Sequence, residues 1–164
     1  MLPLATHNLD ISACDSSLFD GNWLTSSGTY YDTLVAANGC DSIITLNLTI
    51  NTSPLVELGN DTTLCYGNSI DLNAGNGFNY LWSDATINQV LTINHSGAYN
   101  VTITDINGCT DSDSINITIS DPLLVLLDST NITCNGLTDG IVTSTVSGGT
   151  PNYTYIWNDA AAQI

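Results

Sequence analysis

The sequence predicts an all-β chain built from tandem, disulfide-closed β-sandwich modules. Three observations predict this fold class: short segments in which apolar and polar residues alternate, turn-forming residues between those segments, and groups of residues that recur after a fixed interval. Hydrophobic residues make up 43% of the 164 residues, and three Trp and seven Tyr supply bulky side chains. The chain can therefore bury a core, and disorder is excluded.

Four short segments recur 69 residues further along the chain, which is the pattern of tandem modules. The repeated pairs are 27–30 with 96–99, 38–40 with 107–109, 46–50 with 115–119, and 64–67 with 133–136. We therefore expect three modules, at 1–51, 54–120 and 122–164, joined near Pro54 and Pro122. The first is a short Cys-containing repeat that we expect to be truncated at its start.

The second module carries the clearest strand pattern. Two alternating segments flank an Asn-Gly turn within residues 98–119, so this region is predicted to form a β-hairpin. Further short strands are predicted at 55–58, 69–73, 78–82 and 89–93. Six or seven short strands in such a small module favour a β-sandwich. The third module lacks a counterpart of the hairpin, so we expect it to be incomplete at its C-terminal end.

The five cysteines show no CxxC or other zinc-binding spacing. Their wide spacing favours disulfides and an oxidising, extracellular location. If each module closes its own disulfide, Cys14 pairs with Cys40 and Cys65 pairs with Cys109. Cys134 is then left without a partner, which we expect to lie outside the chain.

The charge balance excludes several classes of function. The chain has no Lys or Arg and 16 acidic residues, for a net charge of −16. Neutralising phosphates requires cationic side chains, so nucleic acids and polybasic contacts with lipid surfaces are excluded. No apolar segment is long enough for direct membrane insertion. The partners that we expect are neighbouring modules or copies of the same protein, and surface polysaccharide or other cells.

No catalytic residues are predicted, and we expect the chain not to be an enzyme. The two histidines, His7 and His95, belong to different modules, and neither has a Ser or Cys nucleophile at a catalytic spacing. His95 lies in a turn and is interpreted as a solvated side chain. Asp111 and Asp113 imitate a glycosidase carboxylate pair, but their turn-like setting favours a solvated cluster.

No organic cofactor is expected, and Ca²⁺ is the one metal that the sequence suggests. Asp105, Asn107, Asp111 and Asp113 gather around one predicted hairpin loop, and hard oxygen ligands at a turn can hold Ca²⁺. The spacing does not match an EF-hand loop. Diffuse condensation of cations on an acidic surface is the alternative interpretation.

Three segments resemble repeats of secreted bacterial adhesins. Residues 27–50, with Asn-Gly-Cys at their centre, resemble the short Cys-containing repeats in giant adhesins of Bacteroidota. Residues 58–109 resemble the immunoglobulin-like, PKD-like modules of the same proteins. Residues 132–157 are similar to the SprB repeat of gliding-motility adhesins, although Asn152 stands where that repeat usually has a second Pro. The resemblance implies type IX secretion, a cell-surface location and a stalk or shaft role.

Glycosylation is expected on two kinds of site. Asn-x-Ser/Thr sequons place candidate N-glycans, which such an Asn-rich chain also produces by chance, at Asn47, Asn60, Asn100 and Asn116. The family resemblance adds an Asp-Ser/Thr-apolar-or-Thr signal for O-glycans at Thr33, Ser42, Thr62, Ser114 and Ser129. A sugar coat at these positions would shield sheet edges.

Aromatic pairs occur twice in a Tyr-x-Trp pattern. Trp82 and Trp157 each follow a Tyr by two residues, so each pair shares one face of a strand and is predicted to be core. The alternative is that these aromatic side chains form a sugar-binding platform, and this alternative is strongest for Trp23.

Taken together, these features predict a non-catalytic structural segment, a stalk, shaft or fibre, of an extracellular surface adhesin that mediates adhesion or gliding. One alternative is a carbohydrate-binding accessory region of a secreted glycoside-degrading enzyme. Another is a filament subunit that polymerises by strand exchange, with the third module completed by strands of a neighbouring chain.

Overall fold

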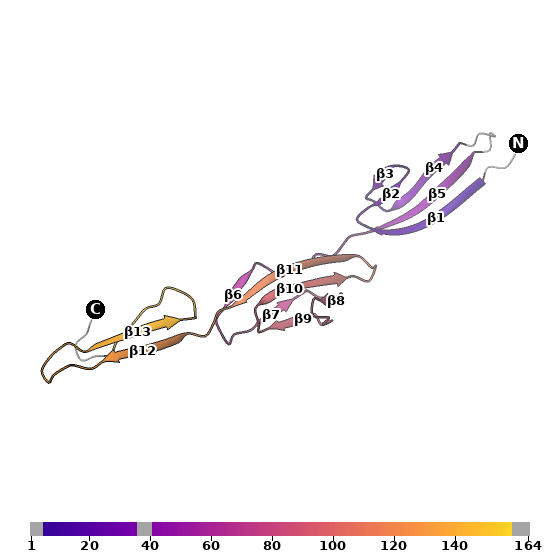
Figure 1. Ribbon diagram of the computed structural model, residues 1–164. Coiled ribbons are helices and arrows are strands. Elements are labelled where there is room, and N and C mark those ends of the chain that lie inside the picture. Colours follow the sequence, from indigo (N-terminus) through magenta and orange to yellow (C-terminus); the bar gives the residue numbers. More distant parts are fainter. Residues whose placement is uncertain (1–4, 36–40, 159–164) are drawn as a thin grey trace. The chain divides into compact units, whose positions relative to one another are not determined.

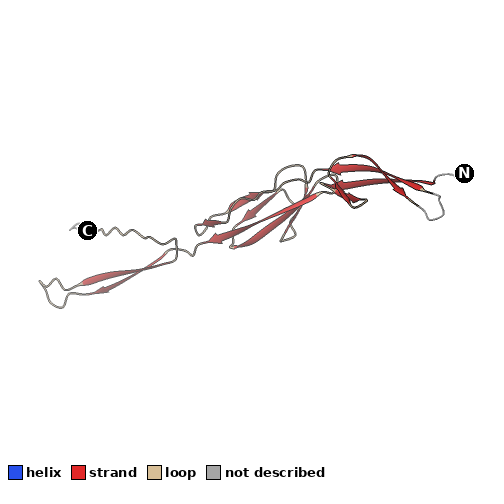
Figure 2. Ribbon diagram, turned by 90° about the horizontal axis from the view of Figure 1, so that it is seen from above, coloured by secondary structure: helices blue, strands red, loops and turns tan. Residues whose placement is uncertain are grey.

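The computed structural model describes residues 5–35 and 41–158, and in those ranges it contains strands and turns but no helix (Figures 1 and 2). The all-β prediction is therefore confirmed. No helix able to cross a membrane is found in the described ranges. The strands are β1 (Ala5–Cys14), β2 (Ser17–Phe19), β3 (Asn22–Leu24), β4 (Gly28–Leu34), β5 (Ser42–Asn51), β6 (Thr62–Leu64), β7 (Ile70–Asn73), β8 (Asn79–Trp82), β9 (Val90–Ile93), β10 (Gly97–Thr104), β11 (Thr110–Ile119), β12 (Leu124–Thr130) and β13 (Ile141–Ser147).

The strands form several small sheets, as expected for β-sandwich modules. One sheet has the order β1-β5-β4 and another the order β6-β11-β10-β8. Two-stranded sheets are formed by β2 with β3, β7 with β9, and β12 with β13. β1 runs parallel to β5 and β6 runs parallel to β11, whereas β4 with β5 and β8 with β10 are antiparallel. No sheet mixes strands from 5–51, 62–119 and 124–147, and the three-module division stays a prediction.

Local sequence patterns located most strands of the middle region correctly. The segments at 69–73, 78–82 and 89–93 contain β7, β8 and β9, and the predicted hairpin is β10 and β11. The strand predicted at 55–58 is wrong, because this segment forms no ladder. The N–H groups of Val56 and Leu58 instead donate to the carboxylates of Asp111 and Asp113 on β11.

The contacts divide the chain into two compact units. The first consists of Met1–Leu58, Asn73–Leu91 and Asn100–Ser114, and the second of Gly59–Leu72, Thr92–Tyr99 and Ile115–Ile164. Side chains no more than 3% exposed in the first unit are Leu46, Leu48, Ala74, Trp82, Val101, Ile103 and Cys109. In the second unit they are Leu72, Ile93, Ile115 and Ile117. Most of these residues alternate along their strands, so one face of each strand is buried.

The two Tyr-x-Trp pairs differ in burial. Trp82 is 2% exposed and its Nε1 donates to the carbonyl of Asn88 at 2.8 Å, so the core prediction is confirmed there. Trp157 is 44% exposed, and the core prediction is wrong for it. The physical reason is that β12 and β13 form a sheet of only two strands, in which every residue of β12 is exposed.

Candidate functional site

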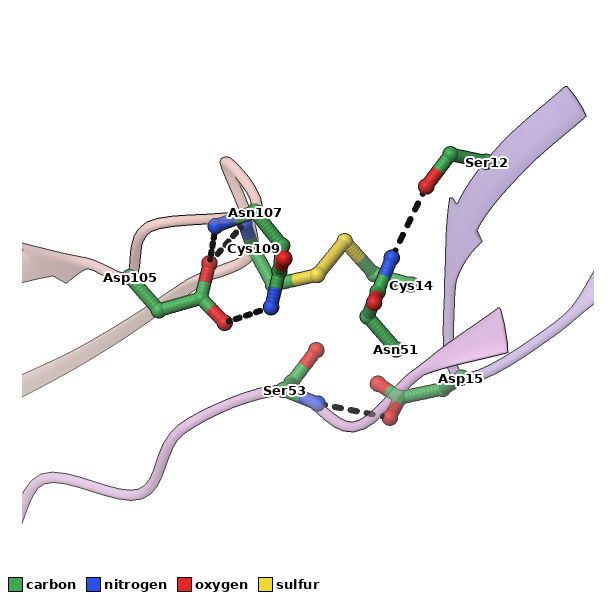
Figure 3. Close-up of a disulfide and its surroundings, with 8 residues drawn as sticks. All are labelled: Ser12, Cys14, Asp15, Asn51, Ser53, Asp105, Asn107 and Cys109. Carbon is green, nitrogen blue, oxygen red and sulfur yellow. Dashed lines mark hydrogen bonds between the residues drawn. A yellow bond between two sulfur atoms is a disulfide. The ribbon is translucent and has the colours of Figure 1, made fainter. Parts of the chain in front are cut away.

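A disulfide joins Cys14 to Cys109 within the first unit (Figure 3). The S–S distance is 2.02 Å, the Cα atoms lie 5.7 Å apart, and 95 residues separate the two cysteines in sequence. The predicted pairs of Cys14 with Cys40 and of Cys65 with Cys109 are therefore wrong. Cys65 and Cys134 are free and exposed, and Cys40 lies outside the described residues.

Strand direction explains why the predicted pairs do not form. Because β1 and β5 are parallel, Cys14 lies beside Asn51 at the end of β5, whereas Ser42 at its start lies beside Ala5. A strand of this length places Cys14 about 30 Å from Ser42, at the opposite end of β5. Cys65 and Cys109 are also far apart. Because β6 is parallel to β11, Cys65 lies near the end of β11, whereas Cys109 comes directly before the start of β11.

The chain around Cys14 is held by polar contacts between the ends of β1 and β5. Asp15, with a positive φ of 59°, donates its N–H to the Asn51 carbonyl at 2.8 Å. The Asp15 carboxylate accepts the N–H of Ser53 at 2.9 Å (Figure 3). Hydrogen bonds from the Ser53 side chain and backbone lower the pKa of Asp15. The Asn51 amide donates to the Ser12 hydroxyl at 2.8 Å. Together these contacts fix the direction in which the chain leaves β1.

Cys109 is presented by a tight turn between β10 and β11, and it is 1% exposed. The Asp105 carboxylate accepts the N–H groups of Asn107 and Cys109, each at 2.8 Å (Figure 3). Gly108 adopts a φ of 84°, which a side chain rarely permits. The Asn-Gly signal in the sequence thus located the turn correctly, and the Asp side chain closes it.

The predicted calcium ligands have other roles in the structure. Asp105 caps its own turn, Asp111 accepts the Val56 N–H at 2.8 Å, and Asp113 accepts the Leu58 N–H at 2.7 Å. In the part of the chain that the structure describes, no three His, Cys, Asp or Glu side chains gather as metal ligands. The ligand set of Asp105, Asn107, Asp111 and Asp113 is therefore not assembled.

The glycosylation candidates lie on the strands and their edges. Thr33, Ser114, Ser129 and the four asparagines are exposed, whereas Ser42 and Thr62 are half-buried. The amides of three asparagines donate hydrogen bonds: Asn47 to Asp10, Asn100 to the carbonyl of Asp113, and Asn116 to Asp61. An N-glycan on any of these amides would leave one N–H to donate, so these hydrogen bonds do not decide between the two kinds of site. Glycosylation itself stays a prediction.

The sequence analysis missed an apolar groove along β12 and β13. It has a volume of about 520 Å³ and is lined by Leu123, Val125, Leu127, Val146, Tyr155 and Trp157, among others. The apolar run at 123–127 was the available signal. Apolar residues in this run do not alternate with polar ones, which is the pattern of a strand that is buried on both faces. In the structure these side chains are exposed instead.

Residues 126–162 match the family described as SprB repeat, which confirms the resemblance seen in that part of the sequence. The SprB repeat is a feature of cell-surface adhesins, and such repeat families are generally non-catalytic. No curated protein matches the chain significantly. Among solved structures, the chain is similar to three immunoglobulin domains of titin in a Glu-to-Ala variant. The TM-score is 0.41 at 12% identity, covering 89% of this chain and 74% of that one.

Proposed function

We propose that the chain is a non-catalytic structural segment, a stalk or shaft, of an extracellular surface adhesin that a bacterium of the Bacteroidota exports by type IX secretion. Its role is to carry load in adhesion or gliding and to hold an adhesive tip away from the cell. The SprB repeat supports the surface location. The chain has no Lys or Arg, so its surface is negatively charged and repels nucleic acids and neighbouring acidic chains.

The observation that carries this proposal is the disulfide between Cys14 and Cys109. It closes a loop that contains β2 to β10, so tension applied at the two ends of the chain passes through the sulfur atoms rather than through those strands. A load-bearing segment benefits from such a shortcut, because the closed part cannot be pulled open while the bond is intact.

Single-molecule extension tests the mechanical part of the proposal. With handles at both ends, the oxidised chain is expected to unfold to a contour length roughly 320 Å shorter than the reduced chain, from 95 residues at about 3.4 Å each. The matched control is Cys65→Ser, which removes an exposed free thiol and leaves the loop closed. Equal lengths in both redox states would contradict the proposal.

Labelling of intact cells tests the location. Antibodies against the purified chain are expected to stain unpermeabilised cells of the producing bacterium, and deletion of the coding segment is expected to reduce attachment or gliding. Staining that requires permeabilisation would contradict a surface role.

A carbohydrate-binding accessory region is the second candidate, and exposed aromatic side chains favour it. Trp23 is 69% exposed, and Tyr155 and Trp157 lie on the groove at 54% and 44%. Titration with surface polysaccharides tests it, since Trp23→Ala or Trp157→Ala would then weaken binding.

A further inference from the structure

Cys14 and Cys65 hold the same place in the fold. β5 and β11 are related by the 69-residue interval, so Ile50 and Ile119 are counterparts. In the parallel ladder of β1 with β5, Ile50 pairs with the residue before Cys14. In the parallel ladder of β6 with β11, Ile119 pairs with the residue before Cys65. Each cysteine therefore lies where the strand parallel to its neighbour ends.

A side-chain hydrogen bond supports this equivalence. The Asn47 amide donates to the Asp10 carboxylate at 2.8 Å. Asn116, 69 residues after Asn47, donates in the same way to the Asp61 carboxylate at 3.1 Å. Each contact joins the segment that leads to a cysteine with the strand beside it. The two ladders therefore have the same register, and the two cysteines are counterparts.

Cys134 is a third cysteine of this kind. It lies 69 residues after Cys65, and the same turn follows both. The Asn68 N–H donates to the Cys65 carbonyl at 3.1 Å, and the Leu137 N–H donates to the Cys134 carbonyl at 3.1 Å. The glycines two residues after these cysteines have positive φ, 83° and 91°. The three cysteines thus represent one repeated position.

The second kind of cysteine ends an Asn-Gly-Cys sequence. This sequence occurs at 38–40, outside the described residues, and at 107–109, in the turn between β10 and β11. Cys14 is bonded to Cys109, so a cysteine at a strand end is joined to one in an Asn-Gly-Cys turn (Figure 3). β1 belongs to the sheet β1-β5-β4, and β10 and β11 belong to the sheet β6-β11-β10-β8. The bond therefore links two sheets that share no strand and does not close either of them.

We propose that Cys65 forms the same kind of bond, to the cysteine of an Asn-Gly-Cys turn, so that disulfides link successive repeats instead of closing each repeat. The partner turn comes from another repeat of the same polypeptide or from a neighbouring copy. Cys134 takes a partner of the same kind, because it holds the same position. Both thiols are free and exposed in the described chain, so each is accessible to such a turn. The inference goes beyond the stalk role and does not depend on it.

Bond formation needs an oxidant, because two thiols lose two protons and two electrons. A disulfide oxidoreductase, or glutathione disulfide in solution, accepts them. One cysteine thiolate attacks the disulfide of the oxidant, forms a mixed disulfide and releases one thiol of the oxidant. The second cysteine then displaces the other thiol, so one protein disulfide forms and one oxidant disulfide is reduced to two thiols.

Disulfide mapping of the native protein tests the proposal. Free thiols are alkylated, and the unreduced protein is cleaved before each Asp. This places the five cysteines on separate peptides, 10–14, 32–40, 61–70, 105–110 and 128–138. The bond between 10–14 and 105–110 is the internal control for retention of native disulfides.

Peptide 61–70 is expected to be bonded to a peptide that contains Asn-Gly-Cys. Recovery of 61–70 as an alkylated thiol overturns the proposal. A bond from 61–70 to any peptide without Asn-Gly-Cys, 128–138 and a second 61–70 included, overturns it as well.

The purified chain, oxidised with glutathione disulfide, separates the two sources of the turn. If a neighbouring copy supplies it, disulfide-linked multimers are expected, with 61–70 bonded to 32–40. If another repeat of the same polypeptide supplies it, Cys65 is expected to be alkylated in this chain, but bonded in the native protein to a peptide absent from this sequence.

Cys65→Ser in the native protein tests the partner directly. It is expected to leave one Asn-Gly-Cys cysteine as a free thiol and to retain the bond between Cys14 and Cys109. Ser69→Ala, at an exposed position of the same segment, is the matched control and is expected to change neither. A Cys65→Ser protein in which no new Asn-Gly-Cys thiol appears overturns the proposal.

Discussion

The carboxylate of Asp105 accepts the backbone N–H of Cys109 at 2.8 Å, four residues along the chain. The same carboxylate accepts the backbone and side-chain N–H groups of Asn107 at 2.8 and 3.3 Å. One side chain therefore satisfies three donors of the turn that presents Cys109 to Cys14. The turn that presents Cys109 therefore depends on a carboxylate that the sequence analysis named as a candidate calcium ligand.

Replacing Asp105 by Ala is expected to destabilise the fold by about 1–3 kcal/mol, because the buried N–H of Cys109 loses its acceptor. It is also expected to slow reoxidation of the Cys14–Cys109 pair. Urea unfolding and timed thiol trapping measure the two effects. Asp128→Ala is the control, since among the described residues Asp128 accepts the N–H of the adjacent Ser129 on an exposed strand. Equal effects of both variants would contradict the capping role.

Replacing Cys14 by Ser opens a loop of 95 residues. The chain-entropy argument gives a loss of about 4.7 kcal/mol for a loop of about 100 residues, so the urea midpoint is expected to fall sharply. Cys134→Ser is expected to leave the midpoint unchanged, because Cys134 is free and exposed. Peptide mapping without reduction identifies the bond directly. A crosslink between Cys65 and Cys109 would contradict the structure.

The sequence predicted features that depend on neighbouring residues better than features that depend on residues far apart in the chain. Alternation and the Asn-Gly turn are local, and they located β7 to β11 correctly. Disulfide connectivity depends on which strand ends lie together, and the spacing of cysteines does not determine it. Cys14 ends a strand parallel to β5, and Cys65 follows a strand parallel to β11. Cys14 and Cys65 therefore occupy equivalent positions at strand ends, but the residues around them in the sequence are not repeated.

The site was harder to predict than the fold because two of its carboxylates accept N–H groups from a distant part of the sequence. Asp111 and Asp113 are 55 residues from the N–H groups they accept. A local pattern shows only that two carboxylates alternate near a turn, which also suits a metal site. The exposed face of β12 was missed for a related reason, since burial depends on a neighbouring strand that a local window does not contain.

The carboxylates of β11 are expected to protect individual amides of segment 55–58. Asp111→Ala leaves the N–H of the buried Val56 without its acceptor, at a cost of about 1–3 kcal/mol. Hydrogen exchange is expected to accelerate at Val56 and much less at Leu58, and Asp113→Ala is expected to show the reverse. Each variant is the control for the other. Equal acceleration at both amides would show that the segment detaches as a whole.

Stability is expected to fall in acid through Asp61 and Asp139. Hydrogen bonds from the backbone and then the side chain of Asn116 lower the pKa of Asp61 from its ordinary value of 3.8, and those from the side chain and then the backbone of Thr133 lower the pKa of Asp139. A depressed pKa in the folded state stabilises the fold above pH 3.8, and this contribution is lost as the pH falls through the depressed value. Carboxyl ¹³C titration of the folded chain measures the shift, with the chain in urea as reference. A folded pKa at or above the urea value would contradict it.

Replacing Trp by Ala in the two Tyr-x-Trp pairs is expected to change the free energy of unfolding by very different amounts. Trp82→Ala removes a side chain that is 2% exposed together with its hydrogen bond to Asn88, so a loss of about 3–5 kcal/mol is expected. Trp157→Ala removes a side chain that is 44% exposed, and it is expected to change stability by about 0.5 kcal/mol or less. Urea unfolding followed by circular dichroism measures both variants under one condition. A large loss of stability from Trp157→Ala would contradict the exposed position of this side chain.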